Sequence, residues 1–122
     1  MDLTQLRAYL LSKTGAVESA PFDPHTLVYA VGDQVFGLIS RQATPPHLTL
    51  RCRPERAEML RVMYPAIRPG AYMNRRHWNT VSLDDSLSPN ELRTMIDASY
   101  RLALAAGGAP DRLPAVFEEG VL

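Results

Sequence analysis

The pattern of hydrophobic and polar positions predicts that the chain begins with a helix and a β-hairpin. Apolar residues recur at helical spacing over residues 3–13, behind an Asp and a Gln placed as in a capping box. Two apolar runs, residues 27–31 and 34–39, are separated by Gly-Asp, and a two-residue turn with glycine first is typical of a hairpin. The register of such a hairpin places Tyr29 opposite Phe36.

The middle of the chain is predicted to contain an irregular segment, a strand and a helix. Residues 16–24 include two prolines that block regular hydrogen bonding, so we expect an irregular segment there, with Phe22 as a core plug. Residues 47–52 alternate between polar and apolar side chains, which predicts a third strand. A helix then follows over residues 55–63, because Pro54 suits a first helical turn.

The second half of the chain predicts two further strands and a final helix. Residues 67–81 start with a Pro-Gly turn and predict two short strands joined by a polar crossing. Ser88 begins the clearest helix signal, since proline follows it and Glu91 occupies the third helical position. The apolar stripe of this helix continues to a glycine pair at Gly107. Residues 109–122 show no periodicity, which predicts a tail. Three apolar side chains would dock it: Leu113, Val116 and Phe117.

The order of these elements predicts an α+β fold. Consecutive strands with short turns imply an antiparallel sheet of about five strands, and helices must cover one face of it, which gives two layers in the order α-β-β-β-α-β-β-α. No linker divides the chain. We therefore expect one domain over residues 1–108, followed by a C-terminal tail over residues 109–122.

Length and composition are those of an ordinary soluble domain. The chain has 122 residues, of which 46% are hydrophobic and 21% charged, so it has room for one core. No run approaches the ~20 apolar residues of a membrane span. The first residues also lack the basic start and apolar run of a signal peptide. We therefore expect a cytoplasmic protein without a membrane partner.

The cysteine and histidine content predicts no metal site and no cofactor. Cys52 is the only cysteine, so it forms no internal disulfide and no Cys-rich zinc site. The three histidines, His25, His47 and His77, lie in different predicted elements without ligand spacing. The strand pattern predicts a buried, inert Cys52 thiol, and the chain has no Gly-rich phosphate loop. An enzyme is therefore a minority hypothesis.

Charge is distributed unevenly along a chain whose net charge is zero. Residues 41–80 contain eight arginines and two glutamates, a net charge of +6, so the rest of the chain carries −6. This asymmetry has two interpretations, which are chance scatter and a basic face for an anionic partner. The zero net charge of the whole chain argues against strong, indiscriminate binding of nucleic acid.

The polar crossing within residues 67–81 concentrates rings, amides and arginines around Trp78, the only tryptophan. In one interpretation Trp78 packs under a helix and the polar side chains bond to nearby backbone. In the other these side chains face solvent, where arginines contact phosphate, amides and imidazole read base edges, and Tyr72 stacks on a base. The candidate nucleic-acid-binding residues are Arg51, Arg53, Asn74, Arg75, Arg76, His77 and Asn79.

The same stretch resembles the signature of a known family. Pro69-Gly70-x-x-Met73-Asn74-Arg75-x-His77-Trp78-Asn79-Thr80-Val81 is similar to the signature of the MmcQ/YjbR family. Three further segments support the resemblance, which spans about residues 3–105: Glu18-x-x-Pro21-Phe22-Asp23, Val31-Gly32-x-x-Val35-Phe36 and Arg51-Cys52-x-Pro54. Family members often carry Tyr-His after the Pro-Gly, where this chain has Ala71-Tyr72.

This resemblance implies a CyaY-like α+β fold and a DNA-binding protein with a double-wing motif. The namesake of that fold binds iron through an acidic first helix. The first helix here offers Asp2 beside Arg7 and Lys13, so iron binding does not carry over.

Three functional hypotheses follow from the sequence. The first is a nucleic-acid-binding module that uses the central arginines, with DNA as the partner. The second is a protein-interaction module, because the order of elements resembles that of small secretion-chaperone-like domains. The third is an enzyme or small-ligand site around Asn74, His77 and Cys52, which requires a deep pocket.

Overall fold

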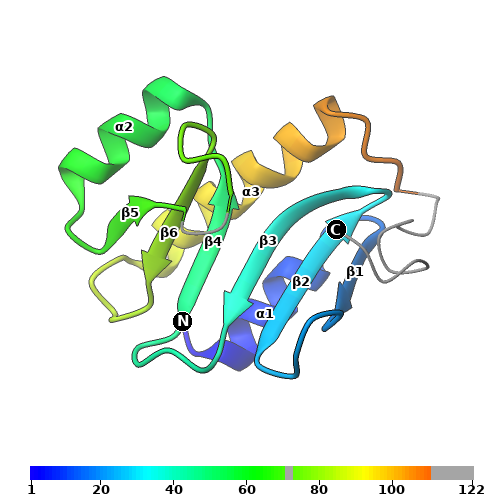
Figure 1. Ribbon diagram of the computed structural model, residues 1–122, viewed down its shortest axis with the longest axis horizontal. Coiled ribbons are helices and arrows are strands. Elements are labelled where there is room, and N and C mark those ends of the chain that lie inside the picture. Colours follow the sequence, from blue (N-terminus) through cyan, green and yellow to red (C-terminus); the bar gives the residue numbers. More distant parts are fainter. Residues whose placement is uncertain (71–72, 111–122) are drawn as a thin grey trace.

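The computed structural model describes residues 1–70 and 73–110, which form one antiparallel sheet with helices on one of its faces (Figure 1). The strand order in the sheet is β1-β2-β3-β4-β6-β5. The elements in chain order are α1 (Leu3–Leu11), β1 (Ala16–Ser19), β2 (Thr26–Val31), β3 (Gln34–Ser40), β4 (His47–Arg51), α2 (Pro54–Met63), β5 (Ile67–Pro69), β6 (Trp78–Ser82) and α3 (Pro89–Ala105). The two-layer α+β architecture predicted from the sequence is confirmed.

The sheet has one more strand than the five predicted. β1, Ala16–Ser19, lies within the segment 16–24 that we expected to be irregular. It pairs with β2 at the edge of the sheet, and the two prolines of the segment follow it. The prediction failed because every β1 residue is half-buried, so the strand shows no strong alternation of apolar and polar side chains. The side chain of Phe22 is 55% exposed, so its predicted role as a core plug is wrong.

The first hairpin forms as predicted, but its register changes within the strands. Val31 faces Gln34 across the turn, whereas a bulge between Tyr29 and Ala30 shifts the partner of Tyr29 to Gly37. The predicted pairing of Tyr29 with Phe36 is therefore wrong. Both rings still face the helices and are fully buried, because the bulge lets Phe36 point toward the core as the extra residue.

The helices begin at the residues that the caps predict. Asp2 and Gln5 form a complete capping box on α1, and Ser88 and Glu91 form another on α3. α1 ends at Leu11, slightly earlier than predicted. The predicted docking of the C-terminal tail through Leu113, Val116 and Phe117 lies outside the described residues.

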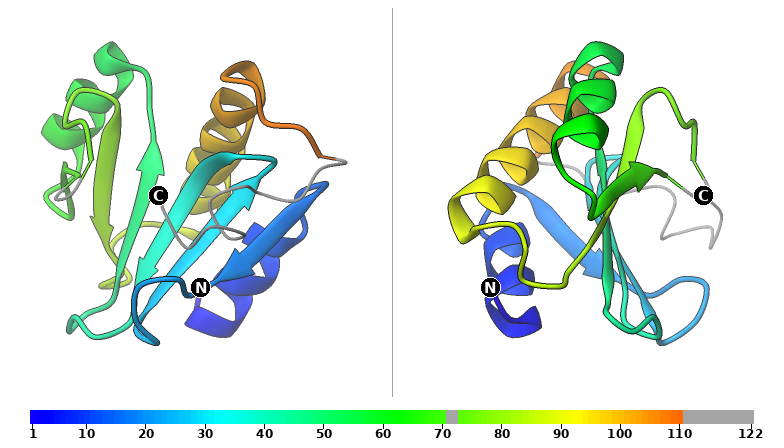
Figure 2. Two further views of the ribbon diagram at one scale, coloured as in Figure 1. Left: turned by 45° about the vertical axis from the view of Figure 1, so that its right-hand side comes forward. Right: turned by 90° about the vertical axis from the view of Figure 1, so that its left-hand side faces the viewer.

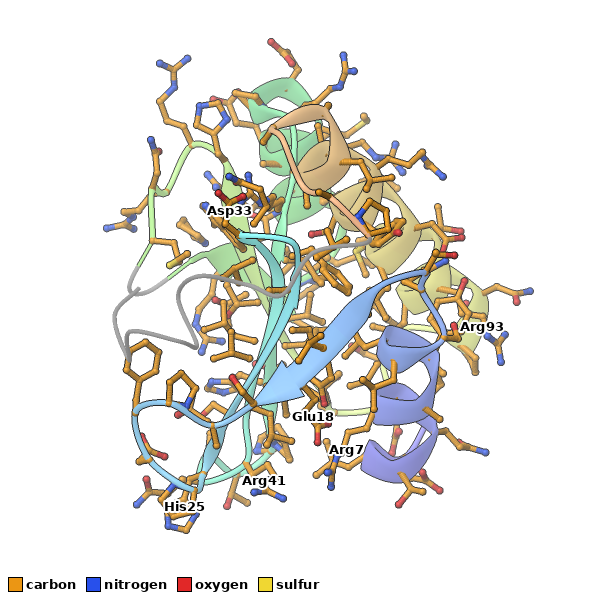
Figure 3. The ribbon with its side chains drawn as sticks, turned by 90° about the vertical axis from the view of Figure 1, so that its right-hand side faces the viewer. Arg7, Glu18, His25, Asp33, Arg41 and Arg93 are labelled. Carbon is orange, nitrogen blue, oxygen red and sulfur yellow. The ribbon has the colours of Figure 1, made fainter. Side chains whose placement is uncertain are left out.

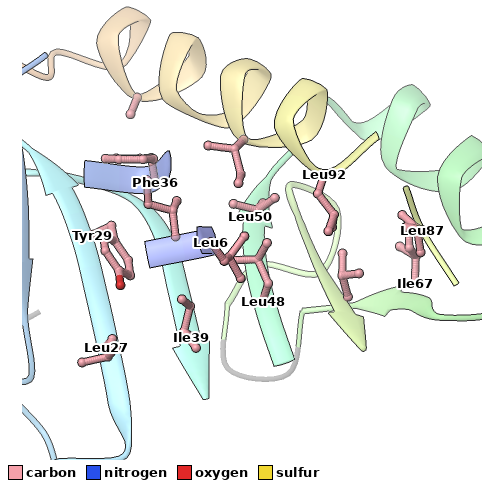
Figure 4. Close-up of a cluster of buried hydrophobic side chains, with 14 of the residues drawn as sticks. Leu6, Leu27, Tyr29, Phe36, Ile39, Leu48, Leu50, Ile67, Leu87 and Leu92 are labelled. Carbon is pink, nitrogen blue, oxygen red and sulfur yellow. The ribbon is translucent and has the colours of Figure 1, made fainter. Parts of the chain in front are cut away.

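The main core lies between the sheet and α1 and α3 (Figure 4). Leu6 from α1 and Ile96 from α3 are at most 1% exposed and meet Ile39 and Leu48 of the sheet. Burying each such side chain contributes about 1.5–3 kcal/mol, so this cluster is the main source of stability.

The hydroxyl of Ser99, on α3, bridges β3 and β4 at the end of the sheet where their backbone pairing stops. The last backbone pair at that end is Gly37 with Leu50. Beyond it, the buried side chain of Ser99 lies between the carbonyl of Phe36 and the N–H of Arg51. The position of the β4 end, where the basic segment of the chain begins, therefore depends on α3.

Candidate functional site

One backbone hydrogen bond joins the two segments that carry the predicted site. The N–H of Cys52, just after β4, donates to the carbonyl of His77, just before β6, over 2.7 Å. This bond extends the pairing of Arg51 with Trp78 by one step. It brings the arginines near residue 52 and those near residue 76 to the same end of the sheet.

A tight turn over residues 73–77 presents basic side chains to solvent. The carbonyl of Asn74 accepts from the N–H of His77 (3.0 Å), and its side-chain oxygen accepts from the N–H of Arg76 (2.9 Å). Asparagine favours such turns because its short side chain can bond to the backbone two residues on. Arg75, Arg76 and His77 are all exposed. Asn74 therefore shapes the turn, and the three following residues face outward.

Arg51 is held against the sheet. Its Nε donates to the carbonyl of Val35 (2.5 Å) and its Nη2 to Oε1 of Gln34 (2.8 Å), and its guanidinium lies 5.1 Å from the ring centre of Trp78. Burial lowers the pKa of Arg51 from its very high usual value, but the group stays charged near neutral pH. Because its guanidinium is engaged with these partners, Arg51 lies against the sheet beneath the exposed side chains of the site. Arg53, in contrast, is exposed to solvent.

Asn79 is buried, although the sequence interpretation placed it on the exposed side. Its side chain is 4% exposed and faces the helices with Val81, because β6 alternates in that phase. Its Oδ1 accepts from Nε of Arg61 over 2.7 Å, and its Nδ2 donates to the carbonyl of Ala57 over 3.3 Å. The expected exposure of Asn79 is therefore wrong, and its amide joins β6 to α2.

Arg61 is a site residue that the sequence analysis did not select. Its guanidinium bonds to the side chain of Asn79 and to the backbone carbonyls of Arg75 and Trp78. It thus fixes the start of β6 and the preceding turn against α2. One signal could have revealed it, because Arg61 lies four residues after the buried Ala57 on the same face of α2.

A shallow, open hollow lies beside the Cys52–His77 hydrogen bond. Its lining includes Cys52, Arg53, His77 and Leu102 of α3. Burial raises the pKa of the Cys52 thiol, while the nearby Arg56 opposes this change to a smaller extent. A raised pKa disfavours the thiolate that nucleophilic catalysis requires. The open shape and the thiol chemistry thus give little support to the enzyme hypothesis.

Over the described part of the chain, no group of three or more His, Cys, Asp or Glu side chains is placed to hold a metal ion. Within the same residues, no helix has the length and apolar character required to cross a bilayer.

The predicted site residues therefore divide into two groups. Exposed side chains gather at the β4–α2 junction and on the neighbouring turn: Arg53, Asn74, Arg75, Arg76 and His77. Arg51 and Asn79 lie beneath them and are engaged with the protein itself. Tyr72, proposed to stack on a base, lies outside the described residues.

Comparison with protein families and sequences gives consistent matches. The family model described as YjbR matches residues 11–102. The chain is 34% identical over 104 residues to the uncharacterized protein YjbR of Escherichia coli (strain K12), which covers 85% of this chain and 88% of that protein. It is 32% identical over 84 residues to the uncharacterized protein YbdF of Escherichia coli O157:H7, 69% of each chain.

Comparison with solved structures gives similar folds. The crystal structure of a Deinococcus radiodurans protein with family-model domain DUF419 superposes with a TM-score of 0.82 at 31% identity, covering 98% of this chain and 88% of that one. A crystal structure of a Pseudomonas syringae protein superposes with a TM-score of 0.73 at 25% identity, covering 84% of this chain and 99% of that one.

Proposed function

The chain belongs to the YjbR family, and we propose that this member is a small nucleic-acid-binding module. The binding surface is the basic end, which we define as the exposed side chains of Arg53, Arg75, Arg76 and His77. The partner proposed is DNA, held mainly through its phosphates. The double-wing mode implied by the family resemblance belongs to the same proposal, with the turn at residues 73–77 as a wing.

The hydrogen bond between Cys52 and His77 is the observation that carries this proposal. It brings Arg53 to the turn that bears Arg75 and Arg76, although more than twenty residues separate them in the sequence. Guanidinium groups bind phosphate oxygens with paired, charge-assisted hydrogen bonds. Several of them at one end of a sheet form an electrostatic footprint for a phosphate backbone.

The hydrogen bonds that hold the turn at residues 73–77 in place also favour a binding role for the basic end. Arg61 and Asn74 fix the backbone of the turn through hydrogen bonds, so the side chains of Arg75 and Arg76 project from a defined position. Pre-positioned groups lose less conformational entropy when they bind. Because the whole chain is electrically neutral, we expect moderate affinity that depends strongly on salt.

Fluorescence anisotropy with labelled duplex and single-stranded DNA tests the proposal at roughly 50 and 200 mM salt. The double variant Arg75→Ala/Arg76→Ala should bind more weakly, and its slope of log K against log salt should flatten by roughly 1.8, the value for two phosphate contacts. A lack of binding at low salt, or an unchanged slope in the variant, would refute the assignment.

A matched control removes two arginines elsewhere. Arg41 follows β3 and Arg93 lies near the start of α3, and both are far from the β2–β3 turn at Asp33 (Figure 3). That turn marks the end of the sheet where the basic end lies, because the side chain of Arg51 bonds to Gln34, directly after the turn. Arg41→Ala/Arg93→Ala changes net charge by the same amount, so it should leave the salt slope near that of the native chain.

A second candidate function rests on α2. Its side chains Met59, Val62 and Met63 form an apolar stripe at helical spacing and are 46%, 87% and 55% exposed. Exposed apolar patches of this kind mark protein–protein contacts. Val62→Ser should reduce capture of a protein partner from nuclease-treated lysate without affecting DNA binding. A variant that captures the same partner equally well would exclude this surface.

A further inference from the structure

An open hollow of about 350 Å³ adjoins the basic end of the sheet. Figure 2 shows that the first turn of α2 and the last turns of α3 lie at the same end of the sheet, and both contribute to this hollow. Its volume lies in the range of about 300–1,000 Å³ that small-molecule sites usually have, so a planar ring fits inside it. The lining includes Cys52, Arg53, Pro54, Glu55, His77 and Leu102.

Part of this lining is apolar or aromatic. Leu102 lines the hollow and is not part of the main core between the sheet and the helices. Pro54, the first residue of α2, adds the apolar surface of its ring, and the exposed His77 adds a planar imidazole. Nucleobases stack on aromatic rings such as imidazole and pack on apolar side chains, because every base has a flat face without charge.

The hollow also contains one carboxylate among the arginines. Glu55 is exposed in the first turn of α2. The ion pairs within the described residues are made by Arg7 and Lys13, so no paired cation neutralises Glu55 there. A carboxylate repels phosphate, but it accepts hydrogen bonds from an exocyclic amino group such as N4 of cytosine. The hollow therefore suits a base better than a phosphate.

We propose that this hollow receives one unpaired base of single-stranded DNA, and that Glu55 accepts a hydrogen bond from the exocyclic amino group of that base. The inference rests on the proposed function, in which Arg53, Arg75 and Arg76 hold the phosphates. Arg53 and His77 belong to the basic end and also line the hollow. A strand whose phosphates lie on the basic end therefore carries its bases past the hollow.

A base inside the hollow has to be free of its pairing partner. In a duplex the bases are stacked and paired, so entry requires extrusion of a nucleotide at a cost in free energy. A single strand offers unpaired bases without this cost. We therefore expect tighter binding of a single strand than of a duplex with the same number of phosphates.

Fluorescence anisotropy of the full chain at low salt tests for base binding. A labelled strand of deoxycytidines should bind roughly tenfold more tightly than an abasic strand of the same length, which has the same phosphates and no bases. Equal Kd values for these two strands would overturn the base site and leave the phosphate surface in place. If neither these strands nor a duplex binds, the proposed function itself fails, and the base site fails with it.

The variant Leu102→Ser tests whether the base lies in this hollow. It should weaken binding of the deoxycytidine strand roughly fivefold, because the base loses an apolar contact. Its affinity for the abasic strand should be unchanged, which also shows that the variant is folded. Leu11→Ser, at an exposed position of α1, is the control and should change neither affinity. An unchanged affinity of Leu102→Ser for the deoxycytidine strand would overturn this placement of the base.

The variant Glu55→Ala tests recognition of the amino group. Thymine has a carbonyl where cytosine has its amino group, so the native chain should prefer a deoxycytidine strand to a thymidine strand roughly fivefold. Glu55→Ala should remove this preference. Glu58→Ala, at an exposed position of the same helix, removes the same charge and should keep it. The role of Glu55 is overturned if both variants keep the native preference.

Discussion

The hydroxyl of Ser99 accepts a hydrogen bond from the backbone N–H of Arg51 over 2.8 Å, and it donates to the carbonyl of Phe36 over 2.6 Å. Phe36 and Arg51 would be the next pair of the β3–β4 ladder after Gly37 and Leu50. A side chain from α3 thus replaces a direct bond between strands. Because Ser99 is fully buried, water does not supply a substitute.

Removing this hydroxyl should destabilise the fold. In Ser99→Ala, one buried N–H and one buried carbonyl lose their partner, which should lower the free energy of unfolding by about 2 kcal/mol. Urea denaturation measures the change. Thr94→Ala, at an exposed position of the same helix, should cost less than about 0.5 kcal/mol. Equal stability of the two variants would show that the bridge contributes little.

The buried Tyr29 hydroxyl donates to Oε2 of Glu18 over 2.5 Å, and Arg7 bonds to the same carboxylate. Tyr29→Phe should reduce stability by about 1.5 kcal/mol, since hydrogen bonds to charged groups contribute about 1.5–3 kcal/mol. Thermal unfolding of this variant, with Tyr64→Phe as the control, measures the effect. The interpretation fails if both variants unfold at the temperature of the native chain.

Glu18 should also give the fold a dependence on acid pH. Hydrogen bonding from Arg7, opposed by burial and assisted by Tyr29, lowers the pKa of Glu18 below its ordinary value of 4.5. A lowered folded-state pKa means that the ionised carboxylate stabilises the fold above pH 4.5, and that this contribution is lost as pH falls through the folded-state pKa.

Glu18→Gln provides the measurement. The stability difference between the native chain and this variant should be largest near pH 7 and should shrink below pH 4.5. Glu58→Gln, at an exposed position of α2, should show a much smaller difference at neutral pH. A native-minus-Glu18→Gln difference that stays constant from pH 7 to pH 3 would contradict the assignment.

Arg61 should act on the basic end as a positioning residue. Arg61→Ala leaves Oδ1 of the buried Asn79 without its 2.7 Å donor and frees the turn at Arg75. We expect a loss of about 1–2 kcal/mol in stability. We also expect weaker DNA binding with an unchanged salt slope, because Arg61 contacts protein and not phosphate.

The conservative variant separates charge from geometry. Arg61→Lys keeps the charge but lacks the planar fork that bonds to several oxygens at once. It should therefore fail to restore DNA affinity in anisotropy measurements. Full restoration by lysine would indicate that charge alone is required at position 61.

Local signals in the sequence predicted most of the fold. Ser88 and Asp2 fix helix starts through bonds within four residues of themselves, so their patterns are visible in the sequence. β1 was missed because its stability comes from partners that are distant in sequence. Glu18 depends on Arg7 and Tyr29, each eleven residues away.

The candidate site was predicted less completely for the same reason. The sequence identified the exposed Arg75 and Arg76, but it did not show that they lie beside Arg53, because one hydrogen bond between Cys52 and His77 determines this. The burial of Asn79 depends on Arg61 of α2, eighteen positions earlier. Alternation along a strand gives two faces, but it does not show which face a distant helix will cover.

The Ser99 bridge makes the rim of the sheet compliant. Below Gly37 and Leu50, continuous backbone ladders hold the strands at fixed spacing. Above that pair, only side chains span the gap between the two strands. They are the hydroxyl of Ser99 and the guanidinium of Arg51, which bonds to Gln34 and to the carbonyl of Val35. The ends of β3 and β4 can therefore move apart by giving up these four hydrogen bonds, while the ladder below stays paired and acts as a hinge. The spacing of the two strand ends can thus change without unfolding of the sheet.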